Sequence, residues 1–229
     1  MSALHSLTAE LHAGFLTLAI LGILGTAICQ LIIGFKNRLP KKIVSFAIKA
    51  RGYLEPTSYV GATVGVIALV LSGWTGMNAW PREALLESAI IRNKITLTIF
   101  GTVLWIMILY LRIRFGRGLW TCPMMATLYT GLAIIAFGFV AATGSMGAHL
   151  GTTVGESILD PFWDLFNIDI TKDLVLSSTI AGGIALICVS LLLISLIIAR
   201  RYRLLTVELS PETCQKITSI FKWDEPKLE

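Results

Sequence analysis

Three histidines, His5, His12 and His149, are the residues whose type and position could bind a cofactor. His5 and His12 lie seven residues apart, so on a helix they share one face. They open the first long apolar segment of the chain, and His149 closes the fourth. If each segment crosses a membrane once, these two ends lie on the same side, and His12 could face His149. One imidazole from each of two helices is a common way to ligate haem iron, so we expect His12 and His149 as an axial pair for one haem b.

The cations Arg82, Arg92 and Lys94 are expected on the same side of the membrane as the histidines. A haem held there would turn its propionates to the water face, where Arg92 and Lys94 could pair with them. An equally strong alternative is that these are ordinary cations reaching for water from the ends of spans. The histidines likewise have a plain alternative, as hydrogen-bonded polar residues near a membrane interface.

Each candidate ligand follows a hydroxyl residue by four positions, Thr8 before His12 and Ser145 before His149. In a helix, the backbone carbonyl at that position can accept the second ring proton of a histidine and fix its tautomer. The spacing therefore permits iron ligation by both histidines, although any residue type would provide the same carbonyl.

The composition assigns the chain to the membrane proteins. It has 229 residues, of which 55% are hydrophobic and only 14% charged, with a net charge of +5. A soluble domain carries about 25% charged residues. The basic residues adjoin apolar segments, which excludes a nucleic-acid binder, and the loops are too short for a soluble catalytic domain, so we expect no enzyme activity from this chain alone.

Five segments are long and apolar enough to cross a bilayer, which needs about 20 such residues. We expect helices, because a lone strand would leave its backbone unpaired in lipid. The predicted fold class is therefore an all-α integral membrane bundle with five transmembrane helices. The predicted spans are 7–35, 57–78, 91–111, 124–148 and 174–199.

Lysine and arginine predict the orientation, because they gather in cytoplasmic loops. They are frequent after the first, third and fifth spans and sparse on the other side. We therefore expect a multi-pass protein of the plasma or inner membrane, with its N-terminus outside and its C-terminus in the cytoplasm. Asp and Glu are absent from the central parts of the predicted spans, which argues against an ion-coupled transporter.

The predicted organisation is a four-helix membrane bundle over 1–148, an outer loop over 149–173, a fifth transmembrane helix over 174–200 and a cytoplasmic tail over 201–229. The outer loop carries five acidic residues against the single Lys172, together with several aromatic residues. It is either an interfacial turn with solvated acids or a docking patch for a basic soluble electron carrier.

Two further segments have alternative interpretations. Residues 41–53 combine apolar residues with Lys41, Lys42, Lys49 and Arg51, which predicts an interfacial helix that reaches anionic headgroups. The alternative is a plain basic loop. The four cysteines form no CxxC motif, and no two of them are expected on the outer, oxidising side of the membrane. We therefore expect no disulfide.

Small residues form a stripe along the second span and another along the fourth. Such stripes let helices approach closely, and they can also leave room for a flat macrocycle. Close packing is the default interpretation. The stripes comprise Gly61, Gly65, Ala68, Ser72 and Gly76 in one span, and Gly138, Ala141, Ala142, Gly144, Gly147, Ala148 and Gly151 in the other.

The stretch Thr143-Gly144-Ser145-Met146-Gly147-Ala148-His149-Leu150-Gly151 resembles a glycine- and histidine-rich signature that closes the fourth helix in a family of small membrane domains. These domains are four-helix and cytochrome-b-like, and are often linked to c-type cytochromes. The opening from Leu4 to His12 is similar to the start of that family. The resemblance implies haem b and electron transfer. This chain has Arg92-Asn93-Lys94 where the family tends to carry a further histidine, so only one haem is implied.

The sequence therefore supports two hypotheses. The first is a b-type cytochrome membrane subunit that passes electrons within a respiratory or oxidoreductase complex, in contact with lipid and with other membrane subunits. The second is a cofactor-free accessory subunit that stabilises a larger membrane enzyme.

The orientation can be tested with a cysteine placed at position 160 in a cysteine-free background. We expect an impermeant maleimide to label it from outside in intact cells, because the outer loop should face away from the cytoplasm. Labelling only after the cytoplasmic side is opened would reverse the assigned orientation.

Overall fold

The computed structural model describes residues 3–79, 81, 88–151 and 160–165. Within these ranges all regular structure is helical, and four helices are long and apolar enough to cross a membrane. This confirms the all-α class and the first four predicted spans. The fifth predicted span, Arg82 and the cytoplasmic tail lie outside the described residues. The elements are α1 (Ala3–Gly34), α2 (Lys41–Ala79), α4 (Ala89–Phe115), the 3-10 helix η1 (Gly116–Trp120), α5 (Pro123–Gly151) and the short α6 (Asp160–Leu165).

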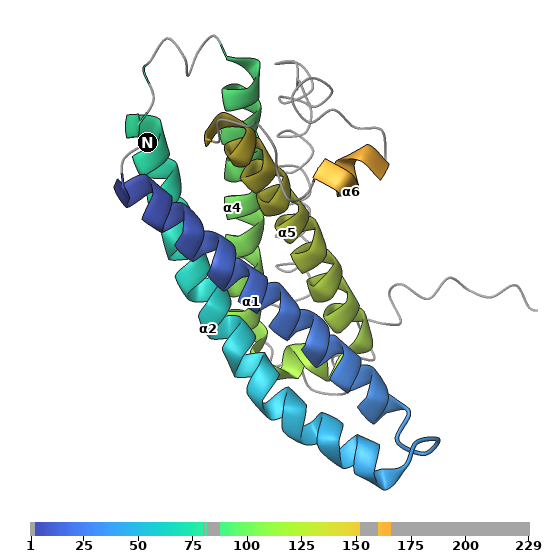
Figure 1. Cartoon of the computed structure of the whole chain (residues 1–229). Coiled ribbons are helices and arrows are strands. Elements are labelled where there is room, and N and C mark those ends of the chain that lie inside the picture. The colour runs from blue at the N-terminus through green and yellow to red at the C-terminus, as the bar shows by residue number, and fades with distance from the viewer. Residues whose placement is uncertain (1–2, 80, 82–87, 152–159, 166–229) are drawn as a thin grey trace, which may run out of the picture.

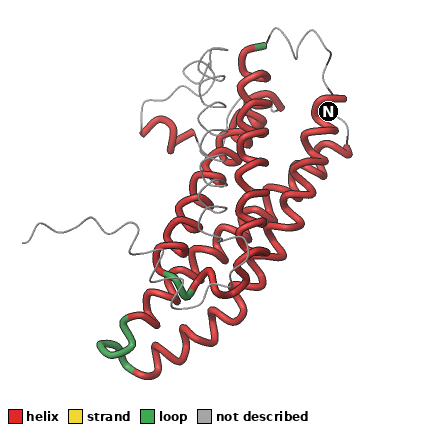
Figure 2. Tube along the Cα trace, turned by 180° about the vertical axis from the view of Figure 1, so that it is seen from behind, coloured by secondary structure: helices red, strands yellow, loops and turns green. Residues whose placement is uncertain are grey.

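The four long helices form an antiparallel bundle of two hairpins, α1 with α2 and α4 with α5 (Figure 1). Each helix of one hairpin also contacts one helix of the other, α1 with α5 and α2 with α4. We call the end where α1 begins and α5 ends the histidine end. The opposite end, where α4 ends and α5 begins, is called the arginine end. The hairpin of α1 and α2 reaches further at the arginine end than α4 and α5 do (Figure 1, Figure 2).

Helix α2 differs from the prediction. Residues 41–53 are helical, so the basic-loop alternative is wrong, but they are not a separate interfacial helix. They form the first turns of one 39-residue helix that continues through Pro56 to Ala79. Pro56 lacks an amide hydrogen, so it cannot donate to the carbonyl of Gly52, and a membrane helix tolerates this loss when neighbouring helices support it.

The tight connection between α4 and α5 follows from local backbone chemistry. Gly116 ends α4 with a φ of 55°, which a residue without a side chain adopts at low cost. Its amide hydrogen bonds to the carbonyl of Arg112. After η1, Pro123 starts α5, where its fixed φ suits the first helical position.

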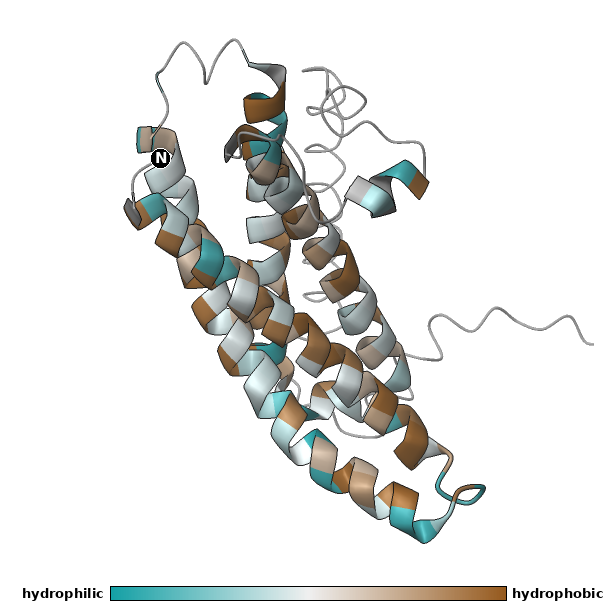
Figure 3. Cartoon of the chain, in the orientation of Figure 1, coloured by the Kyte–Doolittle hydropathy of each residue, from teal (hydrophilic) through white to brown (hydrophobic). Residues whose placement is uncertain are grey.

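Hydrophobic residues, brown in Figure 3, recur along all four long helices, and many of them are exposed. Leu21, Ile28, Val60, Ile99 and Leu128 are each more than half exposed and come from all four long helices. In water such a surface would be unfavourable, whereas lipid accepts it without penalty. The outward faces are therefore suited to contact with a lipid bilayer.

The apolar core joins the two hairpins over only part of their length. One buried cluster takes residues from all four long helices and includes Leu16, Leu69, Trp105 and Val140. Towards the histidine end, the second cluster, Leu97, Ala142 and Met146, comes only from α4 and α5. At that end the described residues therefore pack chiefly within each hairpin.

The two small-residue stripes behave differently. A Cβ added at Gly61 would lie 3.0 Å from the carbonyl oxygen of Phe15, and one at Gly65 would lie 2.5 Å from Leu16 Cδ2. The stripe on α2 therefore serves close packing against α1, as predicted. In contrast, a Cβ at Gly138 or Gly144 of α5 would meet no atom within 4 Å.

We expect Gly65→Ala to destabilise the protein by about 1–3 kcal/mol, because its methyl group would push α1 away from α2. Gly73→Ala is the matched control in the same helix, since a Cβ there meets no atom within 4 Å. It should be neutral or stabilising by up to about 1 kcal/mol, the usual difference between glycine and alanine in a helix. Unfolding of both variants in detergent, followed by circular dichroism, measures this. Equal effects would contradict the close contact.

Candidate functional site

His5 is held in the hairpin of α1 and α2. The residue is only 6% exposed, and its Nδ1 lies 3.1 Å from Thr75 Oγ1. Thr75 Oγ1 also lies 3.1 Å from Thr8 Oγ1, so one hydroxyl bridges two residues of α1. The imidazole packs against Gly76, where an added Cβ would lie 3.0 Å from its Cε1. These contacts explain His5 as a residue that positions the start of α1.

His12 lies about two turns further along α1 and is half-buried. Its Nδ1 lies 3.1 Å from the backbone oxygen of Thr8. A carbonyl oxygen can only accept a hydrogen bond, so Nδ1 carries the ring proton and Nε2 keeps a free electron pair. The hydrogen bond predicted from the four-residue spacing is therefore present, and it prepares Nε2 for a metal.

The other predicted site residues lie at the same end of the bundle, on α4 and α5. His149 is half-buried in the last turn of α5, the helix that neighbours α1. Lys94 is half-buried, and its Nζ would lie 2.7 Å from a Cβ added at Gly147. Lys94 is also within electrostatic range of both His5 and His12. Arg92 is exposed near the start of α4.

The structure thus gathers His5, His12 and Lys94 at the histidine end and places His149 on the adjacent helix. Contact between His12 and His149 remains a prediction. In the described part of the chain, no three His, Cys, Asp or Glu residues are grouped to hold a metal ion by themselves. Haem iron needs only two axial ligands from the protein, so this finding does not bear on it.

Two residues at the histidine end are of types that fit a haem. His12 offers an unprotonated Nε2, and Lys94 supplies a cation at the same end. The apolar cluster that joins all four helices stops short of this end. Gly144 has no atom within 4 Å of an added Cβ. Gly144 is an exposed residue, so this space lies on the outer surface of α5.

Comparison of the chain with models of protein families, with curated proteins and with solved structures finds no match. The likeness to cytochrome-b-like domains consequently remains an expectation based on the sequence motifs.

A second polar cluster lies towards the arginine end, and sequence reasoning missed it. Glu55 of α2 has a side chain that is only 5% exposed. Arg112 of α4 forms an ion pair with it through Nη2, and Arg117 Nε lies 3.7 Å from its second oxygen. The guanidinium of Arg112 also stacks over Tyr59, with its carbon 5.5 Å from the ring centroid. This buried ion pair joins the two hairpins.

Glu55 was missed because the second span was predicted to start at residue 57. The helix starts at Lys41, so Glu55 lies inside α2, two residues before the predicted span. A useful signal was present, because Glu55 is the first acid after six cations and lies a few residues before the apolar run that begins near Tyr59.

The expectation of no disulfide is also wrong. Cys122, which precedes α5, is disulfide-bonded and fully buried, and its partner lies outside the described residues. The expectation rested on the reducing compartment, which acts on thiols that soluble reductants can reach. A cysteine with no exposed surface is protected from them.

Glu55→Gln and Arg112→Gln should each destabilise the protein by about 3–5 kcal/mol, because each leaves one buried charge without its partner. The double variant should lose clearly less than the sum of the two, since it removes both charges together. Equilibrium unfolding in detergent gives the three values. Glu10→Gln is the control, as Glu10 is an exposed acid on α1. Additive losses would contradict the ion pair.

Proposed function

We propose that this chain is a b-type cytochrome membrane subunit that passes electrons within a respiratory or oxidoreductase complex. One haem b would lie at the histidine end, with His12 and His149 as axial ligands. The chain would be the electron-transfer part of the complex rather than an enzyme by itself. Bound haem would supply reversible one-electron oxidation and reduction.

The hydrogen bond from His12 to the backbone of Thr8 is the observation that carries the proposal. It holds the imidazole in the tautomer whose Nε2 can bind iron. A helix backbone is a rigid partner, so the ring orientation is fixed before any metal binds. His5 has a different role, because its ring is buried within the hairpin of α1 and α2, against Thr75 and Gly76.

Lys94 and Arg92 support the proposal through their charge. Carboxylates beside a half-buried ammonium form strong charge-assisted hydrogen bonds. Lys94 lies against Gly147 in the last turns of α5, so its cation is at the same end of the bundle as His149. Arg92, two residues closer to the start of α4, is exposed and could pair with the second propionate.

The histidine end also bears on the proposed membrane orientation and partners of the chain. The distribution of lysine and arginine supports a protein of the plasma or inner membrane with the histidine end outside. On that side Asp164 of α6 is exposed, and it belongs to the acidic loop proposed to attract a basic soluble electron carrier. Other membrane subunits would complete the complex.

The test is a pyridine haemochrome assay and an absorption spectrum of the purified protein. We expect haem b in the native protein and loss of most of it in His12→Ala and in His149→Ala, because each loses an iron bond. Added imidazole should restore the low-spin spectrum of both variants, since it can occupy the vacated ligand position. A merely structural histidine would not give this rescue.

His5→Gln is the matched control, because its amide can keep a hydrogen bond to Thr75 while removing a possible ligand. It should retain haem. Loss of haem in His5→Gln with retention in His12→Ala would reassign the ligand to His5. A native protein without haem would refute the proposal and favour the cofactor-free accessory subunit.

A further inference from the structure

The first turns of α2 carry an unusual exposed face. In the segment 41–54, Ala47 is fully buried and Leu54 packs against Gly25 of α1. The opposite face presents Lys42, Phe46, Lys49 and Tyr53, which follow one another at helical spacing. We call these four residues the lysine–aromatic stripe.

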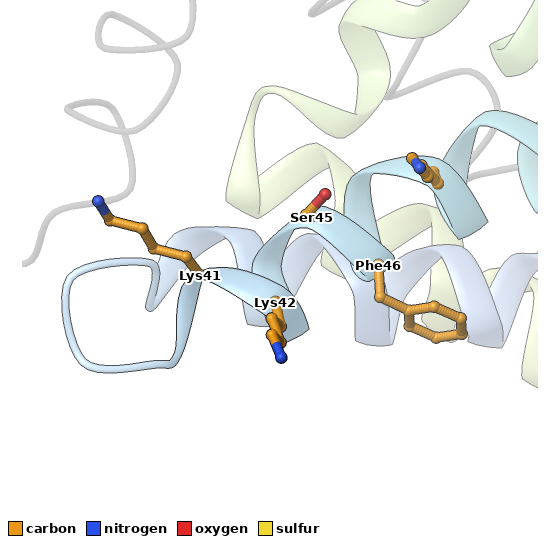
Figure 4. Close-up of a pocket in the computed structure, with 5 residues that line it drawn as sticks. Lys41, Lys42, Ser45 and Phe46 are labelled. Atoms are coloured by element: carbon orange, nitrogen blue, oxygen red, sulfur yellow. The ribbon is translucent and has the colours of Figure 1, made fainter.

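The two aromatic residues of the stripe are largely exposed. Phe46 is 71% exposed and Tyr53 is 77% exposed. Figure 4 shows Lys42 and Phe46 extending from the same side of the α2 ribbon. Lys41, Lys42, Ser45, Phe46 and Lys49 line a shallow pocket of about 460 Å³. A cation, a hydroxyl and an aromatic ring thus surround one open space.

The segment that contains the stripe carries only positive charges. Six cations and no acid occur between residues 36 and 54. Arg51 is engaged, because its Nη1 lies 2.7 Å from Oε1 of Gln30 on α1. For Lys41, Lys42 and Lys49, no ion pair is formed with the part of the chain that the structure describes. These three ammonium groups are therefore available to an anionic partner from outside the described chain.

The apolar residues beside the lysine–aromatic stripe favour a lipid partner over a soluble one. Leu31 and Phe35, at the end of α1, are exposed apolar residues beside the start of α2. A lysine stem can lie along acyl chains while its ammonium reaches the headgroups, and aromatic rings concentrate at the same interface. Alternation of lysine and aromatic residues on one face suits this boundary better than a protein surface in water.

We propose that the lysine–aromatic stripe, together with Lys41, binds an anionic phospholipid headgroup in the leaflet at the arginine end. Lys42 and Lys49 would pair with the phosphate from either side of Phe46, whose ring would enter the acyl region. The site lies at the opposite end from the histidines and does not depend on haem.

The test compares lipid selectivity of the full-length protein in mixed phosphatidylglycerol and phosphatidylcholine bilayers, measured with spin-labelled lipids of each kind. Each lysine near an anionic surface contributes about 1 kcal/mol, or about a fivefold preference. Lys42→Gln with Lys49→Gln should therefore reduce the preference for phosphatidylglycerol severalfold. The reduction should shrink in about 0.5 M salt, where charges are screened.

Lys36→Gln with Arg38→Gln is the matched control, since it removes the same charge from exposed positions of the neighbouring loop. It should change the preference much less. Unchanged preference in the stripe variant would overturn the proposal. An equal loss in both variants would also overturn it and show a diffuse attraction by the whole basic segment. Circular dichroism confirms that both variants keep their helices.

Discussion

A buried carboxylate constrains how the two hairpins of this bundle fit together. Removing a charge from water costs several kcal/mol, so Glu55 requires a cation within reach. Arg112 meets that need from α4, and Arg117 adds a second positive charge. Because Glu55 belongs to one hairpin and Arg112 to the other, their pairing fixes the register of α2 against α4. The glycines of α2 then set how closely α1 lies against it.

The histidine end, away from this ion pair, is packed differently. There the described contacts lie chiefly within each hairpin, through the polar contact of His5 with Thr75 in one and the apolar packing of Leu97 with Met146 in the other. The bundle is therefore closed by charge and core packing towards the arginine end, and carries its histidines and Lys94 where the two hairpins share less core. Such a division suits a cofactor held between helices near one membrane face.

The sequence predicted the parts of the fold that depend on hydropathy. Four apolar runs became four long helices with similar ends, because lipid admits only segments that satisfy their own backbone. The start of α2 was mispredicted, since its lysine-rich turns lower the hydropathy without stopping the helix. The role of Glu55 was missed because the predicted span began after it. Its partner Arg112 could not be identified, because the local sequence of neither segment shows which distant residue it pairs with. For the site, the bond from His12 to Thr8 was predictable from local spacing, whereas the burial of His5 depends on Thr75 and Gly76 of another helix.

The proposed cytochrome requires that one histidine from α1 and one from α5 bind the same iron. Electron–nuclear double resonance of the oxidised, purified protein, grown with isotope-labelled histidine, tests it directly. If both histidines bind the iron, the oxidised protein gives a low-spin ferric signal coupled to nitrogens of two labelled imidazoles. A ferric signal with one coupled histidine, or no ferric haem signal at all, would contradict it.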